Sequence, residues 1–554
     1  MKEIILKNRN LINIIVIILV SIFLSIPLLN KNLNVYVDDG IQHISRAYGT
    51  YLSIKDNKSI PNVISSFSNG FGYSWNLFYG PLSTFGIIII KLFTSNFITA
   101  YKIFVFLCLI LSGYFMYKFI YNYIGNYDVA LLSAILYISF PYHLTDLYIR
   151  HALGEYVSFV FIPLVFLGLY NILYTSSKHY YLTIGAVGLL VTHNLSTIIV
   201  LFFSALYIGL NIEKINKTNV KKSLIVNIIF ILTISCFYWM PLLETKIFCK
   251  YQVYEPGMMA TRESVQDKGL KITQLFVSKN DGSFVFELGP HIIVMLAVSI
   301  MAIRLMDDEI KETYVFCLIS GIISIWMSTK YFPWKLLPEE ISIIQFPWRM
   351  MIMASFFFSI TCSINAYVLV KKFDYKDVII ISCIAVFYTV AFRGYLLYDE
   401  NLANIENITL GRISGKESEA IAGLGKEEYL PVKAYQNRFY IATRDDYIDI
   451  IEGSAIIQNE IKKGTHYTAD IKIEGENYTI LELPYIYYPG YEVRLDGMIT
   501  DTFETKNGFI GFVMGKNDNA KLEVNYVGTK IMNVSIIISS ISLIIFGVYV
   551  WKKH

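Results

Sequence analysis

Long apolar segments recur along most of the chain and are separated by short polar ones. A helix needs about 20 apolar residues to cross the roughly 30 Å hydrocarbon core of a membrane. Segments long enough to span lie near residues 11–29, 98–121, 152–173, 194–212, 222–242, 289–306, 312–329, 345–370, 376–393 and 532–550. Two shorter segments, 127–141 and 180–193, complete a predicted all-α polytopic membrane bundle of about twelve transmembrane helices.

The apolar segment 81–93 is short for a crossing, since it has only about 13 residues. Lysines and arginines in short loops are biased to the cytoplasmic side. If 81–93 does not cross, the basic residues between the segments fall inside: Lys118, Lys178, Lys214, Lys217, Lys221, Lys222, Arg304, Lys311, Lys371, Lys372, Lys376, Lys552 and Lys553. We therefore predict that 81–93 stays at the interface, that the first helix is uncleaved, and that both termini are cytoplasmic.

This topology divides the chain into three parts. Residues 1–393 form a transmembrane module, residues 394–531 an extracytoplasmic domain, and residues 532–554 a final helix with a cytoplasmic tail. The module carries its outer loops at 30–80, 142–155, 244–289 and 330–344.

The extracytoplasmic domain alternates apolar and polar residues from about Arg444 onward, as half-buried strands do. Strands are predicted at 467–473, 478–483, 491–495, 508–513 and 521–526, with turn signals such as Asp496-Gly497 between them. The pattern predicts an antiparallel β-sandwich. The aromatic run 485–491 could stack on sugars, but aromatic residues in strands more often pack within the sheet.

Composition supports a membrane protein, because only 16% of the residues are charged and 55% are hydrophobic. Soluble domains average about 25% charged residues. The net charge of +3 and the scattered basic clusters exclude a nucleic-acid partner. The six cysteines show no CxxC pair and indicate no function. A bacterial plasma membrane is the predicted location, with the β-domain outside.

The first outer loop carries an acidic pair, Asp38 and Asp39, just beyond the first apolar segment. A helix after this pair would place Asp39, His43 and Arg46 on one face, at i, i+4 and i+7. One interpretation is a helix N-cap followed by an amphipathic surface helix. Another is a general base, because a carboxylate at a membrane surface can take the proton of an attacking hydroxyl.

Other ionisable residues lie at the outer ends of predicted spans. Arg150, His151 and Glu155 precede one span, Trp348-Arg349 begins another, and His193 lies in the turn 192–194. Each alone could be a snorkelling side chain or a local ion pair, since charges at membrane depth usually pair or line a cavity. Together they would form a polar cavity with carboxylates at one end and arginines, which grip phosphate well, at the other.

The segments that hold these residues resemble known membrane proteins. An acidic first outer loop, a short helix before the second span and a C-terminal outer domain are similar to the GT-C superfamily of membrane glycosyltransferases. Closer resemblance is to bacterial membrane proteins labelled 6-pyruvoyl-tetrahydropterin-synthase-related, carried by segments 38–46, 69–73, 150–155, 192–194 and 345–349. The segment 488–497 is similar to the end of YfhO-type proteins, which are linked to glycosylation of lipoteichoic acid.

The resemblance implies transfer of a sugar from a polyprenyl-phosphate carrier to a cell-envelope glycan or teichoic-acid-like acceptor. Asp38 or Asp39 would then be the catalytic base, and Arg150 and Arg349 the partners of the leaving phosphate. The remaining candidates would shape the substrate-binding cavity: His43, Arg46, His151, Glu155, His193 and Trp348. Some GT-C families use a divalent cation and others do not, so metal dependence stays open.

Pterin chemistry itself does not fit, because such a synthase needs a three-histidine zinc site. The outer domain holds only His466, and the eight histidines of the chain show no ligand spacing. Two alternatives to the transferase remain. One is a transporter or flippase of a lipid-linked envelope precursor, although no internal repeat supports it. The other is a non-catalytic envelope protein whose β-domain binds a glycan or a partner.

Overall fold

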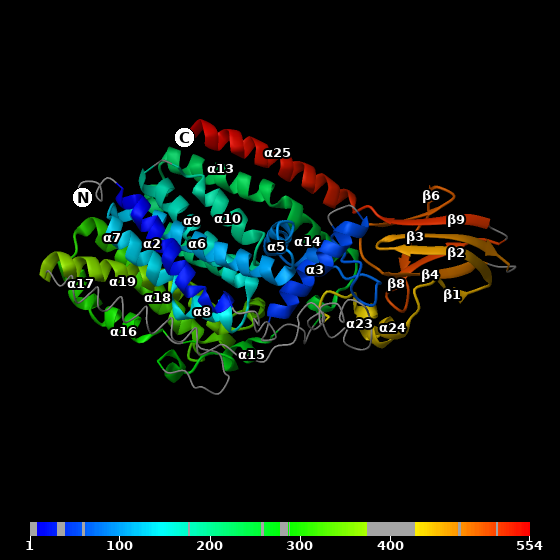
Figure 1. Cartoon of the computed structure of the whole chain (residues 1–554), viewed down its shortest axis with the longest axis horizontal. Helices are drawn as coiled ribbons and strands as arrows, with labels where there is room; N and C mark the ends of the chain where they lie inside the picture. Colours follow the sequence, from blue (N-terminus) through cyan, green and yellow to red (C-terminus); the bar gives the residue numbers. More distant parts are fainter. Residues whose placement is uncertain are drawn as a thin grey trace.

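The apolar segments form a helical body, and the C-terminal strands form a β-region at one end of its long axis (Figure 1). The computed structural model describes residues 8–29, 39–57, 61–175, 178–255, 260–276, 286, 288–373, 427–474, 478–516 and 519–553. The predicted span 376–393 and the candidate Asp38 lie outside these residues.

Helices make up most of the first two thirds of the chain. The first group is α2 (Arg9–Leu24), α3 (Gly40–Asn57), α4 (Trp75–Phe78), α5 (Leu82–Lys91), α6 (Phe97–Ile124), α7 (Tyr127–Ile138), α8 (Pro141–Tyr148), α9 (Leu153–Tyr170), α10 (Tyr181–Leu190) and α11 (Asn194–Leu210). The second is α12 (Ile212–Ile215), α13 (Thr218–Ile234), α14 (Cys236–Phe248), α15 (Arg262–Asp267), α16 (Pro290–Ala297), α17 (Ser299–Leu305), α18 (Asp308–Ser328) and α19 (Met351–Phe373). After the gap come α23 (Val432–Gln436), α24 (Arg438–Thr443) and the final α25 (Lys530–Lys553).

Shorter elements connect these helices. The 3₁₀ turns are η1 (Ile26–Leu29), η3 (Gln252–Tyr254), η4 (Ile272–Leu275), η5 (Trp334–Leu336), η6 (Glu339–Ile344) and η7 (Pro347–Met350). A π-helical turn, η2 (Asn171–Thr175), extends α9.

Five described helices are long and apolar enough to cross a membrane, or up to seven if two bent pairs each count as one span. The five contain Phe97–Ile124, Leu153–Thr175, Ile310–Ser328, Pro347–Lys371 and Lys530–Lys552, all predicted spans. The bent pairs are α7 with α8, at 41°, and α13 with α14, at 65°. The chain is therefore a multi-pass, mostly helical membrane protein, while the count of twelve remains a prediction.

Several predicted spans form helices that are shorter than their apolar segments. The segment 289–306 is split between α16 and α17, of 8 and 7 residues. The segment 180–193 forms only the 10-residue α10. α5 also has 10 residues, and such a helix rises only about 15 Å, half the hydrocarbon thickness. This length agrees with the prediction that 81–93 does not cross.

The helices differ strongly in how much of their surface is covered. The apolar windows in α9 and α19 are 89% buried, whereas that of α25 is only 17% buried. α25 lies along the outside of the body beside α13 and α14 (Figure 1). An exposed helix that is apolar all round needs lipid as its solvent.

Close packing of α9 against α10 depends on two glycines. A Cβ on Gly168 would lie 2.1 Å from the backbone nitrogen of Leu182, and one on Gly185 would lie 2.6 Å from that of Val165. Small residues let membrane helices approach at backbone distance. These two positions therefore fix how tightly α10 closes over α9.

The β-region contains two antiparallel sheets, with strand orders β1-β4-β8-β7 and β2-β3-β9-β5-β6. Their strands are β1 (Asp449–Glu452), β2 (Ala455–Lys463), β3 (His466–Ile473), β4 (Thr479–Ile486), β5 (Tyr491–Leu495), β6 (Met498–Ile499), β7 (Phe503–Glu504), β8 (Phe509–Met514) and β9 (Asn519–Tyr526). One hydrophobic cluster takes residues from both sheets, including Tyr467 of β3 and Phe512 of β8. In the aromatic run, Tyr485 and Tyr488 are buried, as sheet-packing residues are.

The first outer loop lies between the helical body and the β-region. Ile486 of β4 donates its N–H to the carbonyl of Phe71 over 3.0 Å, and Asn69 donates its side-chain amide to the carbonyl of Ile441 over 3.2 Å. Phe78 of α4 stacks on Tyr429, which precedes α23, with 4.8 Å between ring centroids. Residues far apart in sequence therefore enclose this loop from both sides.

Candidate functional site

A buried ion-pair cluster forms where α8 ends and α9 begins. Nη1 of Arg150 donates to Oδ1 of Asp146 over 2.7 Å, to Oε2 of Glu155 over 3.1 Å and to the hydroxyl of Tyr142 over 3.1 Å. Tyr142 in turn donates to Oε1 of Glu155 over 2.6 Å. The side chains of Arg150, Asp146 and Glu155 are 4%, 0% and 2% exposed. Such burial is tolerable because the charges pair, although Oδ2 of Asp146 has no hydrogen-bond partner among the described residues.

Local sequence explains why these groups meet. Asp146 and Arg150 are four residues apart at the end of α8, a spacing that brings side chains together on one helical face. Glu155 stands in the first turn of α9, where the helix dipole favours a negative charge.

Arg349 approaches the same carboxylate from a distant part of the chain. Its Nε lies 3.7 Å from Oε2 of Glu155, and its side chain is 10% exposed. Its Nη1 donates to the carbonyl of Ile344 over 2.8 Å and to the side-chain oxygen of Gln345 over 3.0 Å. Glu155 is thus held between two arginines from different helix ends.

Arg46 of α3 fixes the loop between α4 and α5. It donates to the side chain of Asn76 over 3.0 Å, to the carbonyl of Tyr79 over 2.7 Å and to that of Gly80 over 3.2 Å. The guanidinium also lies 5.0 Å from the ring centre of Tyr79, a cation–π contact. Arg46 is fully buried and acts here as a structural clamp.

Two histidines flank the ring of Tyr79. His43 lies 5.5 Å from it between ring centroids and His193 lies 6.0 Å from it. Burial, with the charge of Arg46 second, lowers the pKa of His43 to about 3. Burial, followed by the charges of Arg349 and Arg150, lowers the pKa of His193 well below its usual value. Both rings are therefore neutral at physiological pH and add no positive charge to the site.

Asp39 stands at the junction of these groups, immediately before α3. Its N–H donates to the carbonyl of Arg150 over 3.1 Å, and its own carbonyl accepts from the N–H of His43 over 3.1 Å. Burial raises the pKa of Tyr79, and the nearby charge of Asp39 raises it further. Within the described ranges Asp39 joins no ion pair, and its side chain is half-buried.

Most of the residues predicted from sequence meet at this site: Asp39, His43, Arg46, Arg150, Glu155, His193 and Arg349. His151 instead directs its Nδ1 toward the hydroxyl of Tyr101 of α6, 3.1 Å away. The predicted separation of carboxylates from arginines is wrong, because the two kinds of group pair directly. The predicted common helix face is also incomplete, since α3 begins at Gly40 and leaves Asp39 outside the helix.

Sequence reasoning missed Asp146, Tyr142 and Tyr79. The i, i+4 spacing of Asp146 and Arg150 was the available signal for the first. With Asp146 included, the site contains three arginines (Arg46, Arg150 and Arg349) and three carboxylates (Asp39, Asp146 and Glu155). This part of the site is therefore close to electrically neutral.

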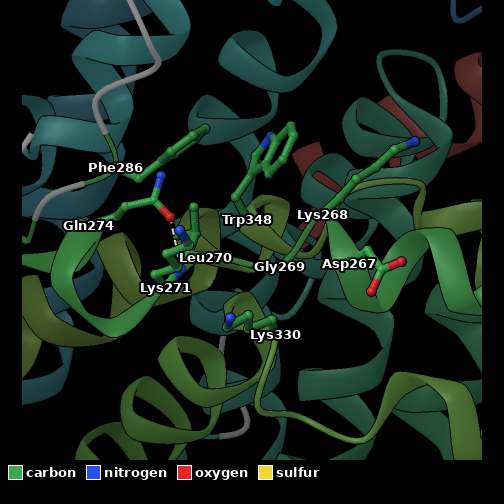
Figure 2. Close-up of a pocket in the computed structure, with 9 residues that line it drawn as sticks. All are labelled: Asp267, Lys268, Gly269, Leu270, Lys271, Gln274, Phe286, Lys330 and Trp348. Carbon is green, nitrogen blue, oxygen red and sulfur yellow. Dashed lines mark hydrogen bonds between the residues drawn. The ribbon is translucent and has the colours of Figure 1, made fainter. Parts of the chain in front are cut away.

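A pocket of about 310 Å³ adjoins the cluster (Figure 2). Its lining comes from the end of α15 and the residues up to η4, from Phe286 before α16, from the loop after α18 and from η7: Asp267, Lys268, Gly269, Leu270, Lys271, Gln274, Phe286, Lys330 and Trp348. Phe286 joins it to the ion pairs, since its ring lies 5.1 Å from Trp348 and 6.1 Å from Tyr142. Trp348, a predicted site residue, therefore faces this pocket.

The segment 77–399 matches the model of a family described as 6-pyruvoyl-tetrahydropterin synthase related domain, membrane protein. The chain belongs to this family. The match contains Tyr79, Arg150, Glu155, His193 and Arg349 but not α3 or the β-region. A pterin synthase would need a three-histidine zinc site, and among the described residues no group of three His, Cys, Asp or Glu could hold a metal ion. We therefore derive no reaction step through a metal.

The chain is also similar to an uncharacterized protein of Lactococcus lactis subsp. cremoris (strain MG1363). The two are 26% identical over 349 residues, which cover 59% of this chain and 55% of the relative. The chain therefore matches little more than half of the relative's length.

Proposed function

We propose that this protein is a membrane glycosyltransferase of the GT-C type, which moves a sugar from a polyprenyl-phosphate donor to an extracytoplasmic envelope acceptor. The acceptor is a glycan or a teichoic-acid-like polymer. The proposal includes about twelve spans, cytoplasmic termini, and an outer β-sandwich built from the two sheets. It is supported by the multi-pass membrane family and by a polar site assembled from helix ends.

The observation that carries the proposal is the placement of Asp39. Asp146 and Glu155 are almost fully buried and both contact Arg150, so neither is open to an acceptor hydroxyl. Asp39 is half-buried, and its backbone is fixed between Arg150 and His43. A general base needs an accessible carboxylate held in a defined position.

In the proposed reaction the acceptor hydroxyl gives its proton to Asp39 as its oxygen attacks the anomeric carbon of the donor sugar. The bond from that carbon to the phosphate oxygen breaks, and polyprenyl phosphate leaves with the electron pair. The side chain of Arg349 is 10% exposed, compared with 4% for Arg150, and its positive charge would stabilise the leaving phosphate. Arg150, which is already paired with Asp146 and Glu155, would add a weaker attraction to the negative charge of the leaving phosphate.

The experiment is release of free polyprenyl phosphate from a panel of lipid-phosphate sugars by the purified chain in detergent. Wild type should release it, and Asp39→Asn should lose most of this activity, since the amide cannot accept the proton. Asp38→Asn is made in parallel, because the sequence leaves either aspartate as the base. Asp501→Asn, at an exposed position of the β-region, is the matched control.

Two results would contradict the proposal. One is full activity in Asp38→Asn, Asp39→Asn and their combination. The other is binding of the lipid by folded wild type with no product from any donor, which would favour transport. Repeating the assay with EDTA tests whether this chain belongs with the cation-dependent GT-C families.

A further inference from the structure

The pocket beside the ion-pair cluster is strongly basic. Lys268, Lys271 and Lys330 line it, and Asp267 is the carboxylate among its lining residues. Figure 2 shows these side chains around the same cavity as Trp348. The lining therefore carries an excess of two positive charges, in contrast to the balanced charges of the neighbouring cluster.

The backbone that carries these lysines is tightly held. Leu270 donates its N–H to the carbonyl of Ser328 over 3.0 Å, and Lys330 donates its N–H to the carbonyl of Leu270 over 3.1 Å. A Cβ on Gly269 would lie 2.3 Å from the nitrogen of Lys330, so the two segments touch at backbone distance. Lys268, Lys271 and Lys330 therefore sit on a preformed frame, which lowers the cost of ordering them around a ligand.

Aromatic residues also line the pocket. Trp348 stacks on Phe346 with 4.5 Å between ring centroids and a 16° angle, and Phe286 lies 5.1 Å from Trp348. The ammonium of Lys268 lies 4.7 Å from the ring centre of Phe346, next to this aromatic wall. A flat apolar wall beside cationic side chains suits a ligand with an anionic group and a sugar or hydrocarbon body.

We propose that this pocket binds the phosphate ester of a substrate before that phosphate reaches Arg349, with Lys268, Lys271 and Lys330 around the phosphate and Trp348 against the attached group. Only the statement that this phosphate ester is a substrate rests on the proposed function. The phosphate belongs either to a prenyl lipid or to a soluble phosphorylated sugar, and both present the same oxygens to the lysines. The Phe286 ring between the pocket and Tyr142 puts the bound ligand one side-chain layer from the ion pairs.

The test is direct binding by the full chain in detergent, with farnesyl phosphate and glucose 1-phosphate as separate probes. The variant Lys268→Gln/Lys271→Gln/Lys330→Gln should bind the recognised probe at least about tenfold more weakly, since three exposed charge contacts are lost. Lys335→Gln, at an exposed lysine close by that does not line the pocket, should bind as wild type does. Trp348→Phe keeps an apolar wall and should weaken binding less than the triple variant.

Binding of farnesyl phosphate alone assigns the pocket to a lipid donor, and binding of glucose 1-phosphate alone assigns it to a soluble phosphorylated sugar. The inference is overturned if wild type binds neither probe, or if the triple variant binds as tightly as Lys335→Gln. If the triple variant is misfolded by size exclusion, the single variants Lys271→Gln and Lys330→Gln replace it, each with a smaller expected loss.

The same binding assay separates this inference from the proposed function. Asp39→Asn should bind the probe as wild type does, because Asp39 does not line the pocket. Lysine-dependent binding without sugar transfer by wild type would leave the pocket assigned and the transferase refuted. Transfer by wild type with lysine-independent binding would refute the pocket alone.

Discussion

Replacing Arg150 with methionine tests whether the buried cluster holds the helix ends together. The change leaves Asp146 and Glu155 almost fully buried without the cation they share. Removing one partner of a buried ion pair typically costs about 3–5 kcal/mol, because the remaining charge stays desolvated. At roughly 2 °C per kcal/mol for a large chain, the apparent Tm in detergent should fall by at least about 5 °C.

Two further variants show whether charge is the cause. Arg150→Met/Asp146→Asn removes one charge of each sign and leaves Glu155 beside Arg349, so it should recover much of the lost Tm. Lys371→Met breaks an exposed pair with Asp307, whose side chains are 61% and 73% exposed, and should cost less than about 1 kcal/mol.

The reasoning is refuted if Arg150→Met unfolds at the same temperature as Lys371→Met. It is also refuted if the double variant lowers the Tm by the sum of the losses measured for Arg150→Met and Asp146→Asn alone, because the effects of independent sites add whereas those of coupled sites do not.

Three other predictions concern single positions. The pKa of His43 is about 3 in the folded chain and near 6.5 in the unfolded chain, so the unfolded chain binds a proton first as the pH is lowered. The contribution of His43 to the free energy of unfolding should therefore fall by about 1.4 kcal/mol for each pH unit as the pH is lowered from 6.5 towards 3. His43→Gln should flatten this part of the pH profile of Tm. Gly168→Ala should lower Tm strongly because its Cβ meets the backbone of α10, whereas Gly209→Ala meets nothing within 4 Å and should be neutral or slightly stabilising. Tyr429→Ala should reduce both Tm and sugar transfer by removing the ring stacked on α4, whereas Tyr447→Ala, at a position 59% exposed, should change neither.

The candidate site was largely predictable because charged residues at the ends of apolar segments stand out. Arg150, Glu155 and Arg349 could be identified in this way, since charges near a membrane must pair or line a cavity. Their pairing could not be predicted, because Arg349 reaches Glu155 through a tertiary contact between helix ends almost two hundred residues apart. Tyr79 was missed because an aromatic residue in a loop carries no polarity signal of its own.

The basic pocket was not predicted at all. Lys268 and Lys330 stand in separate segments of the chain, and they meet because Leu270 is hydrogen-bonded between Ser328 and Lys330. No periodicity in either segment indicates that contact. Apolar length likewise does not show where a helix is interrupted, since the segment 289–306 is apolar throughout and still breaks at Val298.

Strand prediction succeeded where one face of the strand is buried. β3, β5 and β9 show the alternation read from the sequence, and β3 is buried at every second residue. β1 and β2 were not separately predicted. β1 is mostly exposed, and the register of β2 shifts between Gln458 and Ile461, which interrupts its alternation.

The enclosure of the first outer loop by the C-terminal region has a consequence for biosynthesis. Phe78 leaves the ribosome about 350 residues before its partner Tyr429, and Phe71 about 415 residues before its partner Ile486. At about 5–20 residues per second, this loop would wait on the order of 20–80 s for those partners. During that interval the arginine and carboxylate groups are already made while one wall of their surroundings is missing. Enclosure of this loop is thus a late event of synthesis, and a chain that stops before Tyr429 would be inserted in the membrane without it.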